Sequence, residues 1–412
     1  MAVAVKHSYG SRLGNSFKGI LSGLAAVLIG IVLLWWNEGR TVRRYKALNE
    51  TSKKTTPISS EVVKPEFEGM VVHLTGYADT DETLSDMDFN ITLPKTILLR
   101  RSVEIYQWEE RSEEREDTTY YTYRKVWSNR LIDSSDFMEE GHDNPTVQYI
   151  REREDYAADV TLNAFRLSDS QIRRIGQEKT YALPPEYTPP TPTIELQKAF
   201  EKPRVVNDMI YYSVKSNNTQ PTPPAEDAEK TDAAEEKTDD TTTAPLTAKI
   251  GDIRVKFTIV TPHDISIVAQ QCGDSFVPYQ AATGAVELQM DGLHSAEEMF
   301  ASAHSANRLL CWILRLVGFI LIYSGFQMIF KPIAILVSFL PFLERLVGAG
   351  TSLISFLLAL PITLVVIALA WLFYRPVLAI ILIAIVIASF VLLRKKFKEL
   401  KKPETTTPAA QA

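Results

Sequence analysis

The chain has 412 residues, 44 Lys and Arg against 50 Asp and Glu, and a formal net charge of −6. Pro221–Pro245 alone holds eight acids and two lysines, a net of −6, so the remainder is balanced and predicts no nucleic-acid-binding surface. There are two cysteines, Cys272 in a predicted strand and Cys311 at the start of a predicted membrane helix. They predict no disulfide framework.

Four apolar runs without a charged residue predict membrane-spanning helices. They are Ile20–Trp36, Leu316–Phe330, Val347–Phe373 and Val377–Leu393. An α-helix rises 1.5 Å per residue, so about 20 apolar residues cross a hydrocarbon core of about 30 Å. Basic residues precede the first run, as in a signal peptide, but no small-x-small cleavage site follows it. We therefore interpret residues 18–36 as an uncleaved anchor behind a tail of residues 1–17, rather than as a buried core helix.

Residues 55–295 predict a large β-rich domain. Alternating and β-branched sequence indicates strands. The predicted strands are 70–77, 97–108, 120–132, 252–260, 264–271, 276–279 and 285–290. Leu167–Gly176 predicts a short helix, since Ser168 and Gln171 have capping-box spacing. Leu183–Pro203 is a proline-rich connector. Lys215–Pro245 has no large aliphatic or aromatic residue, which predicts a disordered acidic insert.

The C-terminal part predicts a block of three membrane helices. Ser295-Ala296-Glu297-Glu298 has a second capping-box pattern, so one helix should run over 296–330 into the membrane. The segment 331–345 is too short to span and too apolar for water, and predicts an interfacial or re-entrant connector. The next helix, 347–373, should kink at Pro361. A tight turn, Tyr374-Arg375-Pro376, leads into helix 377–393 and a basic, disordered tail, 394–412.

The predicted fold class is therefore α+β, with one N-terminal and three C-terminal membrane helices around the β-rich domain. Six basic residues after the last helix predict a cytoplasmic C-terminus and, with four spans, a non-cytoplasmic domain. The flanks of the first helix favour the opposite orientation, because three basic residues precede it and six follow it within about 20 residues. We give the C-terminal cluster more weight, because long domains translocate with little regard to charge.

Several residues are candidates for contacts at the membrane interface or between helices. Arg308 and Arg315 are seven residues apart and share a helix face. Arg315 could anchor the helix by reaching to the interface, or could contact a lipid phosphate or Glu38. Gly318 and Gly325, also seven apart, allow close helix packing. The remaining candidates are Arg40, in the basic stretch after the first helix, and Arg375, a topology anchor in the last turn.

No pattern of catalytic or metal-binding residues stands out. The six histidines form no HExxH, CxxC or tight His-Asp-Cys arrangement. His142-Asp143 and His263-Asp264 are typical of turns. The acidic stretch Glu226–Asp240 lacks the spaced ligands and glycine of a calcium loop. The sequence therefore predicts no catalytic site, cofactor or metal.

Short stretches in order along almost the whole chain resemble the LUMA family, also called the transmembrane protein 43 family. They are Asn37–Arg40, Val72–Gly76, Arg100–Trp108, Gly141–Pro145, Gly251–Val255, Ser295–Glu298 and Trp371–Pro376. The resemblance implies a four-span protein with its large domain between the first two spans. Leu183–Pro245 departs from the family pattern and looks like an insertion.

The resemblance further implies an organiser of membrane proteins that binds itself and envelope partners. Eukaryotic members lie in the endoplasmic reticulum and inner nuclear membrane, and similar bacterial proteins exist. No catalytic motif belongs to the family. The thiol-poor domain and the low-complexity insert favour a bacterial inner membrane, and the endoplasmic reticulum or inner nuclear membrane is the alternative.

Our functional hypothesis is a non-enzymatic, self-associating membrane scaffold. Its expected partners are membrane lipids, a second copy of the chain, and unidentified membrane or envelope proteins. The alternatives are a transport or channel-modulating subunit and an envelope enzyme. Transport is disfavoured because the predicted helices carry almost no polar residue besides Gln327.

Overall fold

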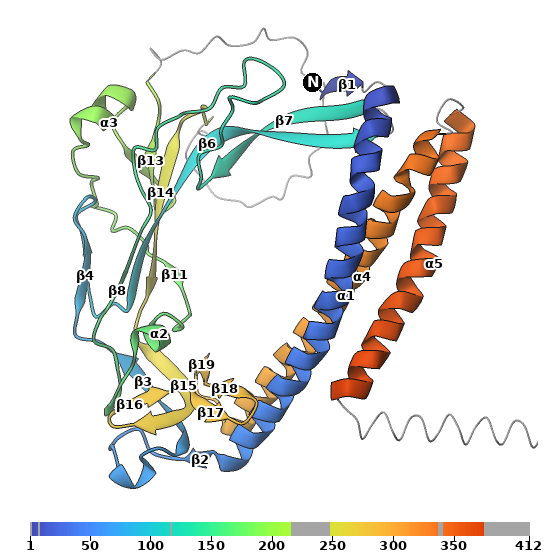
Figure 1. Ribbon diagram of the computed structural model, residues 1–412. Helices are drawn as coiled ribbons and strands as arrows, with labels where there is room; N and C mark the ends of the chain where they lie inside the picture. The colour runs from blue at the N-terminus through green and yellow to red at the C-terminus, as the bar shows by residue number, and fades with distance from the viewer. Residues whose placement is uncertain (1, 7–8, 116–117, 216–247, 337–340, 375–412) are drawn as a thin grey trace, which may run out of the picture. The chain divides into compact units, whose positions relative to one another are not determined.

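The computed structural model describes residues 2–6, 9–115, 118–215, 248–336 and 341–374 (Figure 1). The chain divides into two compact units. The β-rich unit contains Met1–Ser8, Lys54–Tyr279 and Glu287–Met299, and the helical unit contains Tyr9–Lys53, Gln280–Val286 and the chain from Phe300 onward. The prediction of an α+β protein with a large β-rich domain between membrane helices is confirmed.

The described helices include three that are long and apolar enough to cross a membrane. They are α1, Tyr9–Lys54; α4, Ala296–Leu336; and α5, Pro341–Tyr374. In the most apolar window of each, only 17% to 28% of the residues are buried inside the protein, so most of that surface is available to lipid. The predicted fourth span, 377–393, and the tail 394–412 lie outside the described residues, as does most of the predicted insert 215–245.

Two helix boundaries differ from the sequence-based prediction. α1 contains the predicted span 18–36 but begins at Tyr9 and ends at Lys54, a length of about 69 Å at 1.5 Å per residue. The basic stretch after Trp36 is therefore helical, because no glycine or proline interrupts it between Gly39 and Pro57. The predicted connector 331–345 is also largely helical, since α4 reaches Leu336 and α5 begins at Pro341. α5 continues across Pro361.

The β-rich unit contains two large sheets. The first has the strand order β1-β7-β6-β14-β13-β12, with β11 on β14 and β8 on β6; the second has the order β10-β9-β3-β15-β16, with β19 on β15 and β2 on β3. The strands of the first sheet are β1 Ala2–Lys6, β6 Leu98–Arg115, β7 Thr118–Ser128, β8 Arg153–Tyr156, β11 Lys179–Thr180, β12 Arg204–Val206, β13 Met209–Tyr212 and β14 Ile253–Val260. Those of the second are β2 Thr56–Pro57, β3 Val71–Asp79, β9 Thr161–Leu162, β10 Phe165–Arg166, β15 His263–Cys272, β16 Ser275–Val277 and β19 Leu288–Asp291.

The remaining elements are short. They are the hairpins β4–β5, Thr83–Asp86 and Ile91–Pro94, and β17–β18, Tyr279–Ala281 and Gly284–Val286; the 3₁₀ turn Pro65–Phe67; and the helices α2, Asp169–Ile172, and α3, Ile194–Ala199. Both predicted capping boxes are confirmed, at Ser168 with Gln171 and at Ser295 with Glu298. α3 was not predicted; Thr193 caps it by accepting a bond from the Leu196 amide.

Alternation of side chains along β14 shows how the first sheet builds its core. Ile253, Val255 and Phe257 are fully buried and point to one face, where Phe257 packs edge-on against Phe89 with 5.4 Å between ring centroids. Arg254 and Lys256 point to the other face. A second core lies on the second sheet and includes Phe165 stacked on Phe276. These cores hold the long β6–β7 hairpin at its base (Figure 1).

β1 bears on the membrane topology. It pairs antiparallel with β7, with Ala4 opposite Tyr120, so the predicted tail 1–17 contains a strand and the first turns of α1. Residues before a single span and residues after it lie on opposite sides of a bilayer. β1 can therefore pair with β7 only when α1 does not cross. The uncharged run Ile20–Trp36 favours crossing, so we expect β1 to leave β7 in a membrane.

A disulfide-trapping experiment decides between the two arrangements. In protein with Cys272→Ser and Cys311→Ser, the pair Ala4→Cys and Tyr120→Cys should form no disulfide in native membranes. The control pair, Glu109→Cys and Arg124→Cys, faces across the β6–β7 ladder and should oxidise readily. A disulfide in the first pair at the yield of the control would show that α1 does not span.

Candidate functional site

Two charged side chains of the helical unit, Glu38 and Arg315, meet where α1, α4 and α5 converge. Glu38 is only 1% exposed, and both of its carboxylate oxygens are used. Arg315 of α4 donates to them from Nε at 2.6 Å and from Nη2 at 3.0 Å, and the Trp371 indole of α5 donates to Oε2 at 2.9 Å. The Arg315 guanidinium also lies over the rings of Trp312 and Trp371. One carboxylate thus joins three helices.

Arg315 therefore has an internal partner rather than the role of a free interfacial anchor. Of the three roles that its position allowed, the structure shows the contact with Glu38. A two-pronged arginine–carboxylate bond is both strong and directional, and such a pair is retained in an apolar setting only with this geometry. Arg308, on the same helix, is exposed and donates to Ser305. Arg375 lies outside the described residues.

Polar contacts extend from this pair along α1 and α4. Asn37 is fully buried and donates to the Cys311 carbonyl at 3.0 Å. Arg40 donates to the Asn307 side chain at 3.1 Å, and Asn307 donates in turn to the Thr41 carbonyl at 3.0 Å. As the residue number rises along α1, the number of its partner falls along α4, so the two numbers of each pair add up to about 348. The two helices therefore run antiparallel in one register.

Glycines bring the apolar parts of α1 and α4 into close contact. A Cβ atom at Gly325 would lie 2.6 Å from the Gly23 carbonyl oxygen, and one at Gly318 would lie 2.6 Å from Leu34. Small residues allow such close backbone approach, as predicted. However, the neighbouring helix belongs to the same chain. In the structure α1 covers both Gly318 and Gly325, and self-association of the chain stays a prediction.

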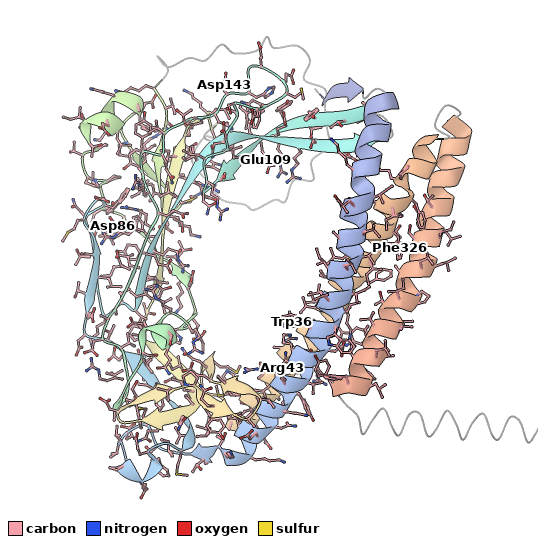
Figure 2. The ribbon with its side chains drawn as sticks, in the orientation of Figure 1. Trp36, Arg43, Asp86, Glu109, Asp143 and Phe326 are labelled. Atoms are coloured by element: carbon pink, nitrogen blue, oxygen red, sulfur yellow. The ribbon has the colours of Figure 1, made fainter. Side chains whose placement is uncertain are left out.

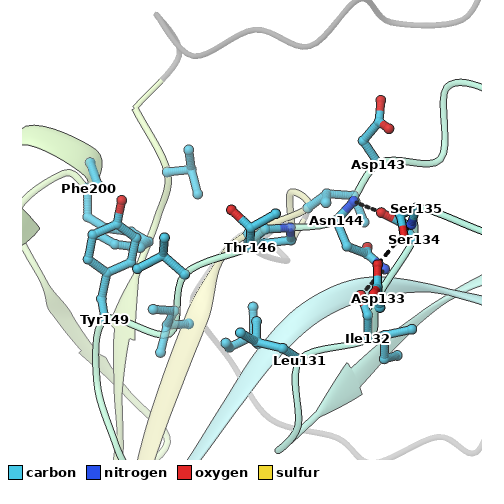
Figure 3. Close-up of a pocket in the computed structure, with 18 residues that line it drawn as sticks. Leu131, Ile132, Asp133, Ser134, Ser135, Asp143, Asn144, Thr146, Tyr149 and Phe200 are labelled. Atoms are coloured by element: carbon cyan, nitrogen blue, oxygen red, sulfur yellow. Dashed lines mark hydrogen bonds between the residues drawn. The ribbon is translucent and has the colours of Figure 1, made fainter.

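The β-rich unit contains an open hollow of about 1120 Å³ (Figure 3). Leu131, Phe200 and Val214 contribute apolar surface to it, and Asp133 and Asp143 contribute carboxylates. The Ser135 amide donates to Asp133 at 2.9 Å and lowers the pKa of that carboxyl, which is therefore ionised at neutral pH. The residues that line the hollow include no histidine or cysteine. An open hollow with an apolar wall and a few polar groups has the composition of a binding groove.

Two further stretches quoted for the family resemblance have structural roles that their sequence did not reveal. The Asn144 side chain accepts a bond from the Trp108 amide and donates to the Trp108 carbonyl, and the Asn144 backbone amide donates to the Ser134 hydroxyl. These bonds fix the loop that edges the hollow. Asp252 is 1% exposed and accepts bonds from the Tyr211 hydroxyl and the Val214 amide. Burial and the Asp252 charge raise the pKa of Tyr211.

A buried ion pair in the β-rich unit also belongs to its framework. Arg101 of β6 is 5% exposed and contacts both oxygens of Asp86 at 2.9 Å, with Asp88 at the same distance (Figure 2 labels Asp86). This network ties the β4–β5 hairpin to the first sheet. Burial raises the pKa of Asp86 and the Arg101 charge opposes that shift. Within the described residues, no group of three His, Cys, Asp or Glu could hold a metal ion.

With this geometry established, comparison with known proteins places the chain. The family model for Transmembrane protein 43 matches residues 105–376, well over half of the sequence. The chain belongs to the transmembrane protein 43 family. The family resemblance expected from the short stretches is confirmed. The matched part includes Arg315 and Trp371 and all of the residues that line the hollow.

The related proteins come from animals. Proteins named Transmembrane protein 43 from Pongo abelii and Homo sapiens are each 28% identical over 406 residues, which covers 93% of this chain and 92% of theirs. A Drosophila melanogaster protein named as a homolog is 28% identical over 382 residues, covering 87% and 89%. No solved structure matches. These relatives support a multi-pass membrane protein, carry no enzymatic name, and give no support to the bacterial membrane favoured by the sequence.

Removing the buried carboxylate tests the ion pair. Glu38→Gln leaves the Arg315 guanidinium without its charge partner and should lower the free energy of unfolding by about 3–5 kcal/mol. Removing the exposed partner of Arg166 by Asp159→Asn should change it by about 1 kcal/mol or less, since both side chains are about 60% exposed. Thermal unfolding of purified full-length protein gives both comparisons. Equal midpoints for the two variants would show that the buried pair contributes nothing.

Adding one methyl group tests the glycine contact. Gly325→Ala places a Cβ against the Gly23 carbonyl and should force α1 and α4 apart, lowering the unfolding temperature by several degrees. The control is Gly19→Ala, where a Cβ meets nothing within 4 Å and alanine favours the helix. The dimer fraction in crosslinked membranes should be the same for both. If Gly325→Ala lost dimers while its unfolding midpoint stayed unchanged, Gly325 would lie at an interface between two copies of the chain.

Proposed function

We propose that the protein is a non-enzymatic membrane scaffold that associates with itself and presents its β-rich unit to other membrane or envelope proteins. The observation that carries the proposal is the use of the bundle's main polar groups to join helices. Glu38 accepts three bonds from Arg315 and Trp371, and Asn37 and Asn307 bond across α1 and α4. A helical block built in this way holds a large unit at a membrane surface.

The same observation disfavours the transport alternative. A solute path through a bundle needs polar side chains that are free to replace water around the solute. Gln327, the main polar residue of the apolar run, donates to the Tyr323 hydroxyl at 2.7 Å, and Ser355 donates to the Thr351 carbonyl at 2.7 Å. The outward surfaces of α4 and α5 are aliphatic and aromatic instead, which suits lipid and other helices.

An open groove in the β-rich unit supports a binding role over an enzymatic one. Its carboxylates and apolar wall suit recognition of a partner's side chains, and its lining residues include no histidine or cysteine. The animal relatives make an endomembrane system a more fitting place for such a scaffold than a bacterial inner membrane.

Crosslinking and flux measurements on the same preparation test the proposal. A lysine-reactive crosslinker applied to native membranes should trap dimers or larger species of the full-length chain. Proteoliposomes of the purified protein should release entrapped ions and small solutes no faster than empty liposomes do. Strictly monomeric protein would remove self-association from the proposal. Solute release well above that of empty liposomes would overturn the scaffold and favour transport.

A further inference from the structure

Three arginines and a histidine lie together on α1 and α4, just beyond the apolar runs of both helices. They are Arg40, Arg44, His304 and Arg308. The antiparallel register brings Tyr45 to 5.1 Å from the His304 ring, measured between centroids, and Arg40 to Asn307. Electrostatic repulsion acts within the group. Arg40 repels Arg44, and both Arg44 and Arg308 repel the protonated form of His304.

Within the part of the chain that the structure describes, this charge has no carboxylate partner. None of the four residues forms an ion pair with any residue that the structure describes, and each of the three arginines bonds only neutral groups. Arg40 donates to Asn307, Asn37 and Thr41; Arg44 donates to the Ala285 carbonyl; Arg308 donates to Ser305. The nearest acid along α1, Glu38, is already bound by Arg315. Partly buried like charges without a counter-charge repel one another, and an anion between them removes that repulsion.

Two buried nitrogens of the group also have no hydrogen-bond partner. They are Nε of Arg40 and Nδ1 of His304. Arg40 Nε is always a donor, and His304 Nδ1 donates in one of its two neutral tautomers. Buried donors are nearly always satisfied in folded proteins, by protein, water or ligand. An anion that accepts hydrogen bonds would satisfy the charge and the unused donors together.

The depth of the group in a membrane indicates which anion this is. Arg40 follows Trp36, the end of the apolar run, by four residues, or about 6 Å of helix (Figure 2 labels Trp36). The headgroup layer extends about 5–8 Å beyond the hydrocarbon on each side. Trp312, one turn from Arg308 on α4, is 66% exposed, as befits an interfacial tryptophan. Arg40 therefore lies at the level of lipid phosphates, with Arg44 about one turn of helix farther from the hydrocarbon.

We propose that Arg40, Arg44, His304 and Arg308 bind the phosphate of an anionic lipid, with preference for a phosphomonoester headgroup. Guanidinium groups bind phosphate oxygens in pairs, and three fixed positive charges suit a phosphate with close to two negative charges better than a phosphodiester with one. The bound lipid joins α1 to α4 at the membrane surface. The site stands whether or not the chain acts as a scaffold.

Lipid binding to the purified full-length protein in neutral detergent tests the site. Dioctanoyl phosphatidic acid should raise the unfolding temperature in a saturable manner, dioctanoyl phosphatidylglycerol should do so at higher concentration, and dioctanoyl phosphatidylcholine should have little effect. Arg44→Gln and Arg308→Gln should each raise the apparent Kd for phosphatidic acid about tenfold. Arg43→Gln is the matched control, because Arg43 is an exposed arginine beside Arg44 and should change the Kd less than twofold.

Three outcomes would overturn the proposal. Phosphatidylcholine could stabilise the protein as well as phosphatidic acid, which would show that the effect is not one of charge. Inorganic phosphate alone could produce the same shift at similar concentration, which would assign the site to a free anion. Arg44→Gln and Arg308→Gln could both keep the wild-type Kd. Arg308 is exposed, so Arg308→Gln is expected to leave the fold intact. This variant keeps the test valid if Arg44→Gln lowers the midpoint without lipid.

Discussion

The bond between Glu38 and Arg315 fixes the helical unit. A charged pair in an apolar environment is stable only when both partners are satisfied together, so the pair allows one rotation and one height for each helix that contributes to it. Trp371 extends the constraint to α5. The glycine contacts follow from this alignment. With Glu38 bonded to Arg315, Gly23 meets Gly325 about four turns further along α1 and about three turns further along α4, where any larger side chain would be excluded.

This alignment explains why α1 continues far beyond its apolar run. Arg40, Thr41 and Asn307 bond across the helices beyond Trp36, and the segment 280–286 is fastened to the same extension. The Arg44 side chain donates to the Ala285 carbonyl, and the Thr283 hydroxyl donates to the Arg43 carbonyl. These contacts stabilise helical structure in a stretch whose composition alone would leave it marginal in water.

The features that sequence predicted are those with local signals. Strands followed from alternation, capping boxes from residues three apart, and the three described membrane helices from uncharged runs. Glu38 and Arg315 were named as candidates, and the bond that the structure shows between them was one of several roles that the sequence allowed. The contacts of Asn144 and Arg101 were not foreseen, because their partners are distant in the chain or specified only by the sheet register. The helix that packs on Gly318 was not foreseen either, since a packing glycine does not indicate which helix packs on it.

The basic residues after the first span now have a physical explanation. Their number favours a cytoplasmic location for that end of α1, whereas the cluster after residue 393 favours the opposite orientation, and the sidedness remains a prediction. Arg40 and Arg44 are held in place by α4 and by the segment 280–286, so they serve the fold as well as any topological signal. A flank count that omits Arg40 and Arg44 falls from six to four basic residues after the span, against three before it, and the conflict with the C-terminal cluster becomes small.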